Sequence, residues 1–123
     1  MARPGAGYRI LLVEDDPLFI DILEAYALRM DVVLVVCHCA EELHTITDWH
    51  FDAALIDYDL PSLDGVRVSQ FIKALVGPIP TFITSGHSKI RKCCPDTVLG
   101  FLPKQDGAEA VLSRVVSACS KTR

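Results

Sequence analysis

The chain has 123 residues, half of them hydrophobic and 23% charged, and a formal net charge of −4. This length suits one domain, and the hydrophobic content is sufficient for a core, which excludes a largely disordered chain. An acidic chain lacks the positive face that nucleic acids require, so direct DNA or RNA binding is not expected. No apolar run approaches the ~20 residues of a membrane helix, which argues against a membrane segment.

Residues 1–7 are too short for a signal peptide and lack its apolar centre, so we expect a flexible leader followed by one domain over residues 8–121. The five cysteines are Cys37, Cys39, Cys93, Cys94 and Cys119. Their odd number and the ample hydrophobic content make a disulfide framework unnecessary. Zinc binding by the first four is an alternative, but their spacing is not that of the usual repeated pair. Reduced thiols in a cytoplasmic protein are the preferred interpretation.

Apolar runs alternate with amphipathic segments along the chain. The apolar runs predict strands at residues 9–14, 32–36, 53–56, 80–84 and 98–103. Helices are predicted at residues 17–30, 40–48, 65–76, 89–94 and 107–120. Such alternation indicates an α/β protein with a doubly wound (βα)5 sandwich, in which helices cover both faces of a parallel sheet. Continuous apolar strands support this, because parallel strands are buried on both faces.

The helices carry apolar side chains at helical spacing, and these are expected to face the core. The first helix is predicted to begin at Pro17 with Asp16 as its N-cap. Its expected inward face consists of Leu18, Phe19, Ile22, Leu23, Tyr26, Ala27 and Met30. That of the 65–76 helix consists of Val68, Phe71, Ile72, Leu75 and Val76. That of the last helix consists of Ala108, Val111, Leu112, Val115, Val116 and Cys119.

Polar residues end or directly follow four of the five predicted strands. Because the carboxyl ends of parallel strands meet at one edge of the sheet, these residues are expected to share one crevice. They are Glu14, Asp15, Asp16, Asp57, Asp59, Thr84, Ser85 and Lys104. Taken singly, Asp57 also suits a turn or helix cap, Ser85 a helix cap, and Lys104 a solvated surface lysine. Their occurrence together at one edge favours a functional site.

Crowded carboxylates repel one another, which raises their pKa values unless a cation is present. Oxygen ligands without cysteine or histidine suit a hard ion such as Mg²⁺, for which Mn²⁺ is a substitute. A carboxylate such as Asp57 is able to accept a phosphoryl group as a nucleophile, while the cation, Lys104 and a hydroxyl neutralise the phosphoryl oxygens. The strand ends therefore favour Mg²⁺-dependent phosphoryl transfer to an aspartate.

From Tyr8 to Ser120 the chain resembles a response-regulator receiver domain. The motifs that carry the resemblance are Glu14-Asp15, Asp57-x-x-Leu60-Pro61-x-x-Asp64-Gly65, Ser85-Gly86 and Phe101-x-x-Lys104. The resemblance implies a CheY-like (flavodoxin-like) sheet in the order 2-1-3-4-5, with Asp57 as the phosphoacceptor. It also implies that the Asp15 and Asp57 side chains and the Asp59 backbone carbonyl hold Mg²⁺, with Glu14 acting through water.

The same resemblance implies a signalling role rather than an enzyme, beyond catalysis of the domain's own phosphorylation and slow dephosphorylation. The phosphoryl donor would be a sensor histidine kinase or a histidine phosphotransfer protein. Ser85 and Phe101 would then move inward and switch the face of helix four, strand five and helix five, which controls an output domain, a partner or a homodimer. Asp59 and His87 occupy positions that tune hydrolysis of the acyl phosphate, although an exposed His87 without that role is an alternative.

Two departures from the family pattern affect the end of the chain. Gln105 stands where the family has a proline joined by a cis bond, so a trans Lys104–Gln105 bond is expected. The step from Ser85 to Lys104 is 19 positions (104 − 85) and contains Pro95, so the fourth helix is expected to be short or irregular.

Two alternatives to a working receiver remain open at this point. One is a degenerate receiver that acts as an unphosphorylated interaction module. The other is a phosphatase of the haloacid-dehalogenase type, because Asp57-Tyr58-Asp59 resembles the Asp-x-Asp motif of that superfamily. In that superfamily the motif normally follows the first strand, and here it follows the third.

Overall fold

The computed structural model describes residues 7–60, 64–86 and 97–122. It contains a five-stranded parallel sheet in the order β2-β1-β3-β4-β5, as expected. The strands are β1 (Arg9–Val13), β2 (Val33–Cys37), β3 (Ala53–Asp57), β4 (Thr81–Ser85) and β5 (Gly100–Pro103). The expected leader (except Gly7), the 89–94 helix and His87 lie outside the described residues.

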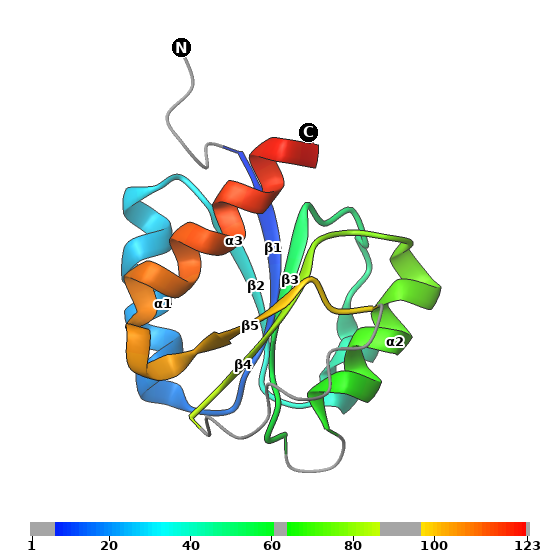
Figure 1. The fold of residues 1–123 in the computed structure, drawn as a ribbon. Helices are drawn as coiled ribbons and strands as arrows, with labels where there is room; N and C mark the ends of the chain where they lie inside the picture. Colours follow the sequence, from blue (N-terminus) through cyan, green and yellow to red (C-terminus); the bar gives the residue numbers. More distant parts are fainter. Residues whose placement is uncertain (1–6, 61–63, 87–96, 123) are drawn as a thin grey trace.

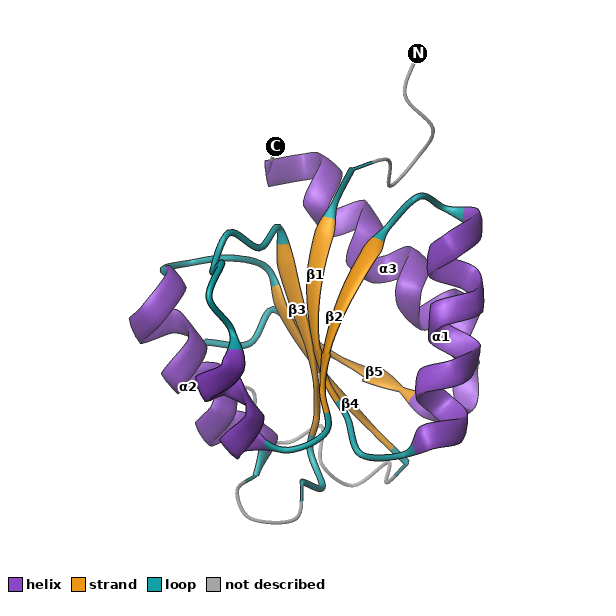
Figure 2. Ribbon diagram, turned by 180° about the vertical axis from the view of Figure 1, so that it is seen from behind, coloured by secondary structure: helices purple, strands orange, loops and turns teal. Residues whose placement is uncertain are grey.

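Helices cover both faces of the sheet, which confirms the doubly wound prediction. They are α1 (Pro17–Arg29), α2 (Gly65–Val76), α3 (Ala108–Thr122) and the 3₁₀ helices η1 (Ala40–Thr45) and η3 (Lys104–Asp106). In both views α1 and α3 lie on one side of the sheet and α2 lies on the other (Figures 1 and 2). No helix in the described part of the chain combines the length and apolar character that crossing a bilayer requires.

The sheet separates two hydrophobic clusters, because alternate strand residues point to opposite faces. Ile10 and Leu12 of β1 face the cluster built with α1 and α3, whereas Leu11 and Val13 face the cluster built with α2 and η1. These four side chains are fully buried, which explains the uninterrupted apolar run in the sequence. The predicted inward face of α3 is also confirmed, since all six of its residues are buried.

The predicted inward face of α1 was partly wrong. Asp16 caps the helix as expected, accepting a hydrogen bond at Oδ1 from the Leu18 N–H at 3.1 Å. Leu18 and Ile22, however, are 68% and 41% exposed, and Ile20 is buried instead. The apolar residues of α1 surround more of the helix than one neighbouring sheet can cover, so periodicity alone did not identify the buried face.

The other prediction errors also lie at the edges of elements. In α2 the buried residues are Gly65, Val68, Ser69 and Ile72, so Phe71 and Leu75 lie on its exposed flank, at 43% and 51% exposure. Strand limits differ by one or two residues from those predicted. The helix predicted over 40–48 is only a 3₁₀ helix, because the chain becomes extended at Ile46. The trans Lys104–Gln105 bond is confirmed.

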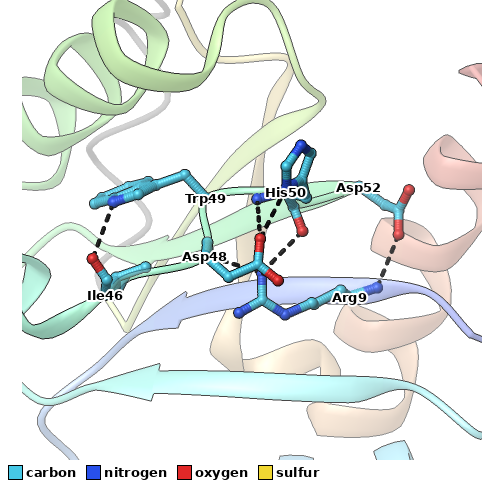
Figure 3. Close-up of polar contacts among 6 residues, drawn as sticks. All are labelled: Arg9, Ile46, Asp48, Trp49, His50 and Asp52. Carbon is cyan, nitrogen blue, oxygen red and sulfur yellow. Dashed lines mark hydrogen bonds and ion pairs between the residues drawn. The ribbon is translucent and has the colours of Figure 1, made fainter.

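Arg9 ties the amino end of β1 to the segment that leads into β3 (Figure 3). Its Nη1 donates to the carbonyl oxygens of Asp48 and His50, at 2.8 and 2.9 Å, and its guanidinium lies over the Phe51 ring, 4.3 Å from the centroid. The Arg9 N–H donates to Asp52 Oδ2 at 2.8 Å, and the Asp52 N–H donates to the Arg9 carbonyl at 2.7 Å. These contacts fix β1 and β3 side by side at the edge opposite the predicted site.

The start of α2 approaches the end of β3 so closely that only glycine fits at position 65. A Cβ built on Gly65 would lie 2.6 Å from the Asp57 carbonyl oxygen and 3.0 Å from the Tyr58 Cα. The Gly65 N–H donates to the Tyr58 carbonyl at 3.1 Å, and the N-cap Asp64 accepts from the Arg67 N–H at 2.9 Å. The loop after Asp57 is therefore closed against the backbone of the strand.

We expect Gly65→Ala to lower the free energy of unfolding by roughly 1–3 kcal/mol, because the methyl group must displace backbone rather than a flexible side chain. The measurement is urea unfolding followed by circular dichroism. Gly100→Ala is the matched control, since its nearest heavy atoms would lie at an ordinary 3.7 Å. Equal stability losses in the two variants would contradict the close approach at position 65.

Candidate functional site

Asp57 is the last residue of β3, and it is only 3% exposed. The Asp59 N–H donates to Asp57 Oδ1 at 3.3 Å, and the Tyr58 N–H donates to the Thr84 carbonyl at 3.0 Å. The carboxylate is thus held at the strand tip by the turn that follows it. This position at the carboxyl edge of a parallel sheet is where ligands bind in open α/β folds.

The acidic pair after β1 lies beside Asp57. Carboxylate oxygens of Glu14, Asp15 and Asp57 all lie within 4.8 Å of one another. Glu14 is fully buried, and its Oε2 accepts from the N–H groups of Asp15 and Asp16 at 3.1 and 3.2 Å. Asp15 is exposed and reaches the same cluster from its rim. In the described part of the chain, no other group of histidine, cysteine or acidic residues meets this spacing.

Lys104 follows β5 and brings one positive charge to these carboxylates. Its Nζ lies 2.9 Å from Glu14 Oε1 and 3.7 Å from Asp57 Oδ1, with the lysine side chain 20% exposed. The ammonium also lies over the Phe19 ring, 5.0 Å from its centroid. The predicted convergence of the ends of β1, β3 and β5 is therefore observed.

The electrostatics of the site follow from burial and from this arrangement. Burial, opposed by the Lys104 ammonium and reinforced by the nearby Asp57, raises the pKa of Glu14 to about 7. Burial also raises the pKa of Asp57, although Glu14 and Lys104 counteract it. Burial alone would lower the pKa of Lys104, but the Glu14 and Asp57 carboxylates outweigh it and raise the value. The sequence predicted the upward shift of the acids from mutual repulsion, whereas desolvation is its larger cause.

The remaining predicted site residues surround this cluster at different distances. Ser85 ends β4 and is 6% exposed, and its neighbour Thr84 pairs with Asp57 in the sheet register. Phe101 in β5 is half-buried and packs against the cluster on the α2 side of the sheet. Asp59 is exposed, and its backbone N–H is directed to Asp57. Asp16 caps α1, as expected.

Two contacts were not predicted. The buried Thr84 hydroxyl donates to the Leu102 carbonyl at 2.8 Å, which joins β4 to β5 just before Ser85 and Lys104. Phe19 was assigned only to the core, yet its ring faces the Lys104 ammonium. No local pattern indicates either partner, because the contacts join residues 18 and 85 positions apart (102 − 84 and 104 − 19).

The described thiols behave as ordinary core or surface groups. Cys37 and Cys119 are buried and Cys39 is half-buried, and no disulfide joins these three thiols. Burial, reinforced by Glu42 and Cys39, raises the pKa of Cys37 to about 11, so this thiol stays protonated at neutral pH. Cys93 and Cys94 lie outside the described residues.

A parallel sheet in the order 2-1-3-4-5 with three carboxylates and a lysine at its carboxyl edge defines a doubly wound α/β protein with an acidic site at the strand tips. The family model described as the response regulator receiver domain matches residues 10–116, and the chain belongs to that family. Receiver domains are signalling domains of two-component systems. Because the match assigns the chain to the receiver family, the haloacid-dehalogenase alternative is set aside.

Known proteins with similar sequence or structure agree with this assignment. The chain is 30% identical over 106 residues to the sensor protein TorS of Escherichia coli, which covers 80% of this chain and 11% of TorS. It is 32% identical over 84 residues to the transcriptional regulatory protein PrrA of Mycobacterium tuberculosis, covering 67% of this chain and 36% of PrrA. The chain therefore spans only a minor part of these relatives.

The crystal structure of the response regulator protein TrrA of Thermotoga maritima, in complex with Mg²⁺–BeF, superposes with a TM-score of 0.77. The match covers 90% of this chain and 98% of the other at 16% identity, so it supports the fold alone.

The raised pKa of Glu14 predicts how stability depends on pH in the absence of a divalent cation. The folded state binds the Glu14 proton more tightly than the unfolded state does. The stabilisation that this proton gives to the folded state is therefore complete below a pH of about 4.5 and is lost as the pH rises through about 7. Asp57 acts in the same direction. We expect the free energy of unfolding to fall by on the order of 3 kcal/mol between pH 4.5 and pH 8.

Urea unfolding across this pH range in the presence of EDTA measures the effect. Glu14→Gln is expected to remove most of the slope, whereas Glu109→Gln, at an exposed position of α3, is expected to leave it unchanged. If the free energy of unfolding of Glu14→Gln still falls with pH as steeply as that of the wild type, a group other than Glu14 is responsible.

Proposed function

We propose that this domain accepts a phosphoryl group on Asp57 from a phosphohistidine of a sensor histidine kinase or a histidine phosphotransfer protein. The observation that supports this most directly is the cluster of Glu14, Asp15 and Asp57 beside the Lys104 ammonium. A nucleophilic carboxylate, a cation site and a fixed positive charge are the parts that phosphoryl transfer to an aspartate needs. The relatives TorS and PrrA, a sensor protein and a transcriptional regulator, fit such a signalling chain.

In the proposed step an Asp57 carboxylate oxygen attacks phosphorus, and an O–P bond forms. The N–P bond of the donor phosphohistidine breaks, its electron pair stays on the imidazole nitrogen, and that nitrogen takes up a proton from water. Lys104 Nζ lies 3.7 Å from Asp57 Oδ1, from which it is able to meet an oxygen of the incoming phosphoryl group. The backbone N–H of Asp59 holds Asp57 Oδ1, so the carboxylate is oriented before the donor arrives.

The donor set fits a hard divalent cation. We propose that the Asp15 and Asp57 side chains and the Asp59 backbone carbonyl hold Mg²⁺, or Mn²⁺ in its place, with Glu14 acting through water. All side-chain donors are carboxylate oxygens from one small cluster, which suits Mg²⁺ better than a softer metal. When bound, the ion supplies positive charge that draws in the phosphoryl oxygens and favours the ionised carboxylates.

The proposed output is a change on the β5 side of the sheet. Ser85 would approach the phosphoryl group, and Phe101 would turn inward. Phe101 is half-buried, and a hollow of about 430 Å³ at the β5 edge is lined by Phe101, Asp106, Ala110 and Arg114. A new position of this ring would alter the surface of β5 and α3, which an output domain, a partner or a second copy would read.

Intact-mass spectrometry after incubation with acetyl phosphate and Mg²⁺ tests the phosphoacceptor. We expect the mass of one phosphoryl group to be added to the wild-type chain and none to Asp57→Asn, because the amide is a poor nucleophile. Asp21→Asn, at an exposed position on α1, serves as the control and should still be labelled.

Absence of label on the wild-type chain would support a degenerate receiver instead. Many turnovers of p-nitrophenyl phosphate would support a phosphatase.

Thermal unfolding with and without Mg²⁺ tests the cation site. We expect Mg²⁺ to raise Tm by several degrees, since a ligand at a hundred times its Kd stabilises the folded state by about 2.7 kcal/mol. Asp15→Asn should abolish the shift, whereas Asp21→Asn, at an exposed position on α1, should preserve it. An equal shift in both variants would place the ion elsewhere.

A further inference from the structure

The Lys104 ammonium has a third neighbour besides the two carboxylates: the aromatic ring of Phe19. We infer that Phe19 is a positioning residue that holds the Lys104 ammonium at the place where it meets the phosphoryl group transferred to Asp57. This inference rests on the proposed function, which it deepens by adding a residue from outside the acidic cluster.

The geometry is that of a cation–π contact. Lys104 Nζ lies over the Phe19 ring, 5.0 Å from the centroid, which is within the range over which the negative face of a ring attracts a cation. The ammonium lies nearest to Glu14 Oε1, at 2.9 Å, and next to Asp57 Oδ1, at 3.7 Å. The ring and the carboxylates therefore hold the flexible lysine side chain at a point that neither would define alone.

The ring supplies an attraction that the chemistry of the site does not change. Glu14 and Asp57 are proposed to meet a cation, and Asp57 is proposed to form a covalent bond, so the pull of each on Lys104 varies during the reaction. The quadrupole of Phe19 stays constant throughout. The contact is also shielded from water, since Phe19 is 8% exposed and Lys104 20%, which strengthens a cation–π attraction.

Phe19 itself has little freedom to move. It stands in the first turn of α1, whose start is set by Pro17 and the Asp16 cap. The ring belongs to the same hydrophobic cluster as Phe82 of β4, the strand that ends at Ser85, and Leu102 of β5, the strand that Lys104 follows. A rigid ring is suited to orient a side chain as flexible as lysine.

The test compares Phe19→Leu with Phe82→Leu. Both substitutions remove a ring from the same cluster, but Phe82 has no described contact with Lys104. We expect Phe19→Leu to lower the rate constant of phosphorylation by acetyl phosphate roughly threefold to thirtyfold, the range of a cation–π contact. Phe82→Leu should change that rate constant less than twofold. Phe19→Tyr, which keeps the aromatic ring, should retain most of the wild-type rate constant.

Two further readouts separate positioning from a general loss of structure. In a Lys104→Ala background, Phe19→Leu should cause no further loss of rate, because the group it positions is gone. In the NMR spectrum of the wild-type chain, ring currents should shift the Lys104 Hε signals upfield. Phe19→Leu should abolish that shift and Phe82→Leu should preserve it. If Phe19→Leu is too unstable to assay, Phe19→Met gives the same comparison.

The outcomes are distinguishable. A labelled wild-type chain with an unchanged rate in Phe19→Leu would overturn this inference and leave the proposed function intact. Equal rate losses in Phe19→Leu and Phe82→Leu, or an additive effect in the Lys104→Ala background, would reduce Phe19 to a packing residue. A wild-type chain that takes up no phosphoryl group would overturn the proposed function and this inference together.

Discussion

A fully buried carboxylate, that of Glu14, depends on the ammonium of Lys104 at 2.9 Å. A buried charge without a partner costs several kcal/mol, so the Lys104 ammonium stabilises the ionised form of Glu14 in its present place. The pair also joins the carboxyl ends of β1 and β5, which are not neighbours in the sheet. Asp57 ends β3, one of the two strands between them, where it experiences the negative charge of one partner and the positive charge of the other.

A polar contact in otherwise apolar surroundings joins two of the strands that carry the site. The Thr84 hydroxyl donates to the Leu102 carbonyl in the interior, and this bond joins β4 to β5 immediately before Ser85 and Lys104. A buried hydroxyl needs such a partner, so its presence fixes the relative position of two strand ends. The bond thus links the strand end that carries Ser85 to the strand that carries Phe101.

The fold was largely predictable because it is specified by local patterns. Continuous apolar strands, a capped helix start at Asp16 and glycine at the turn each restrict the chain independently, and they agree with one another. The acidic pair, Asp57 and Lys104 were predictable for a related reason, since parallel strands bring their carboxyl ends to one edge. The buried face of α1 was not, because Leu18 and Ile22 are apolar and only tertiary packing decides which apolar residues are covered. The contact of Phe19 with Lys104 was equally hidden, because it joins distant segments of the chain.

The Arg9 anchor has a consequence at the far end of the molecule. Strands β1 and β3 are paired so that Val13 lies opposite Ile56, which sets Glu14 beside Asp57. Sliding one strand past the other by a single residue would carry these acids apart by roughly 3.3 Å and turn every side chain to the opposite face. The bonds of Arg9 with Asp52 oppose such slippage roughly 17 Å from these acids along the strands, at five residues of about 3.3 Å each. Arg9 thus helps to set the spacing of the acidic cluster without contacting it.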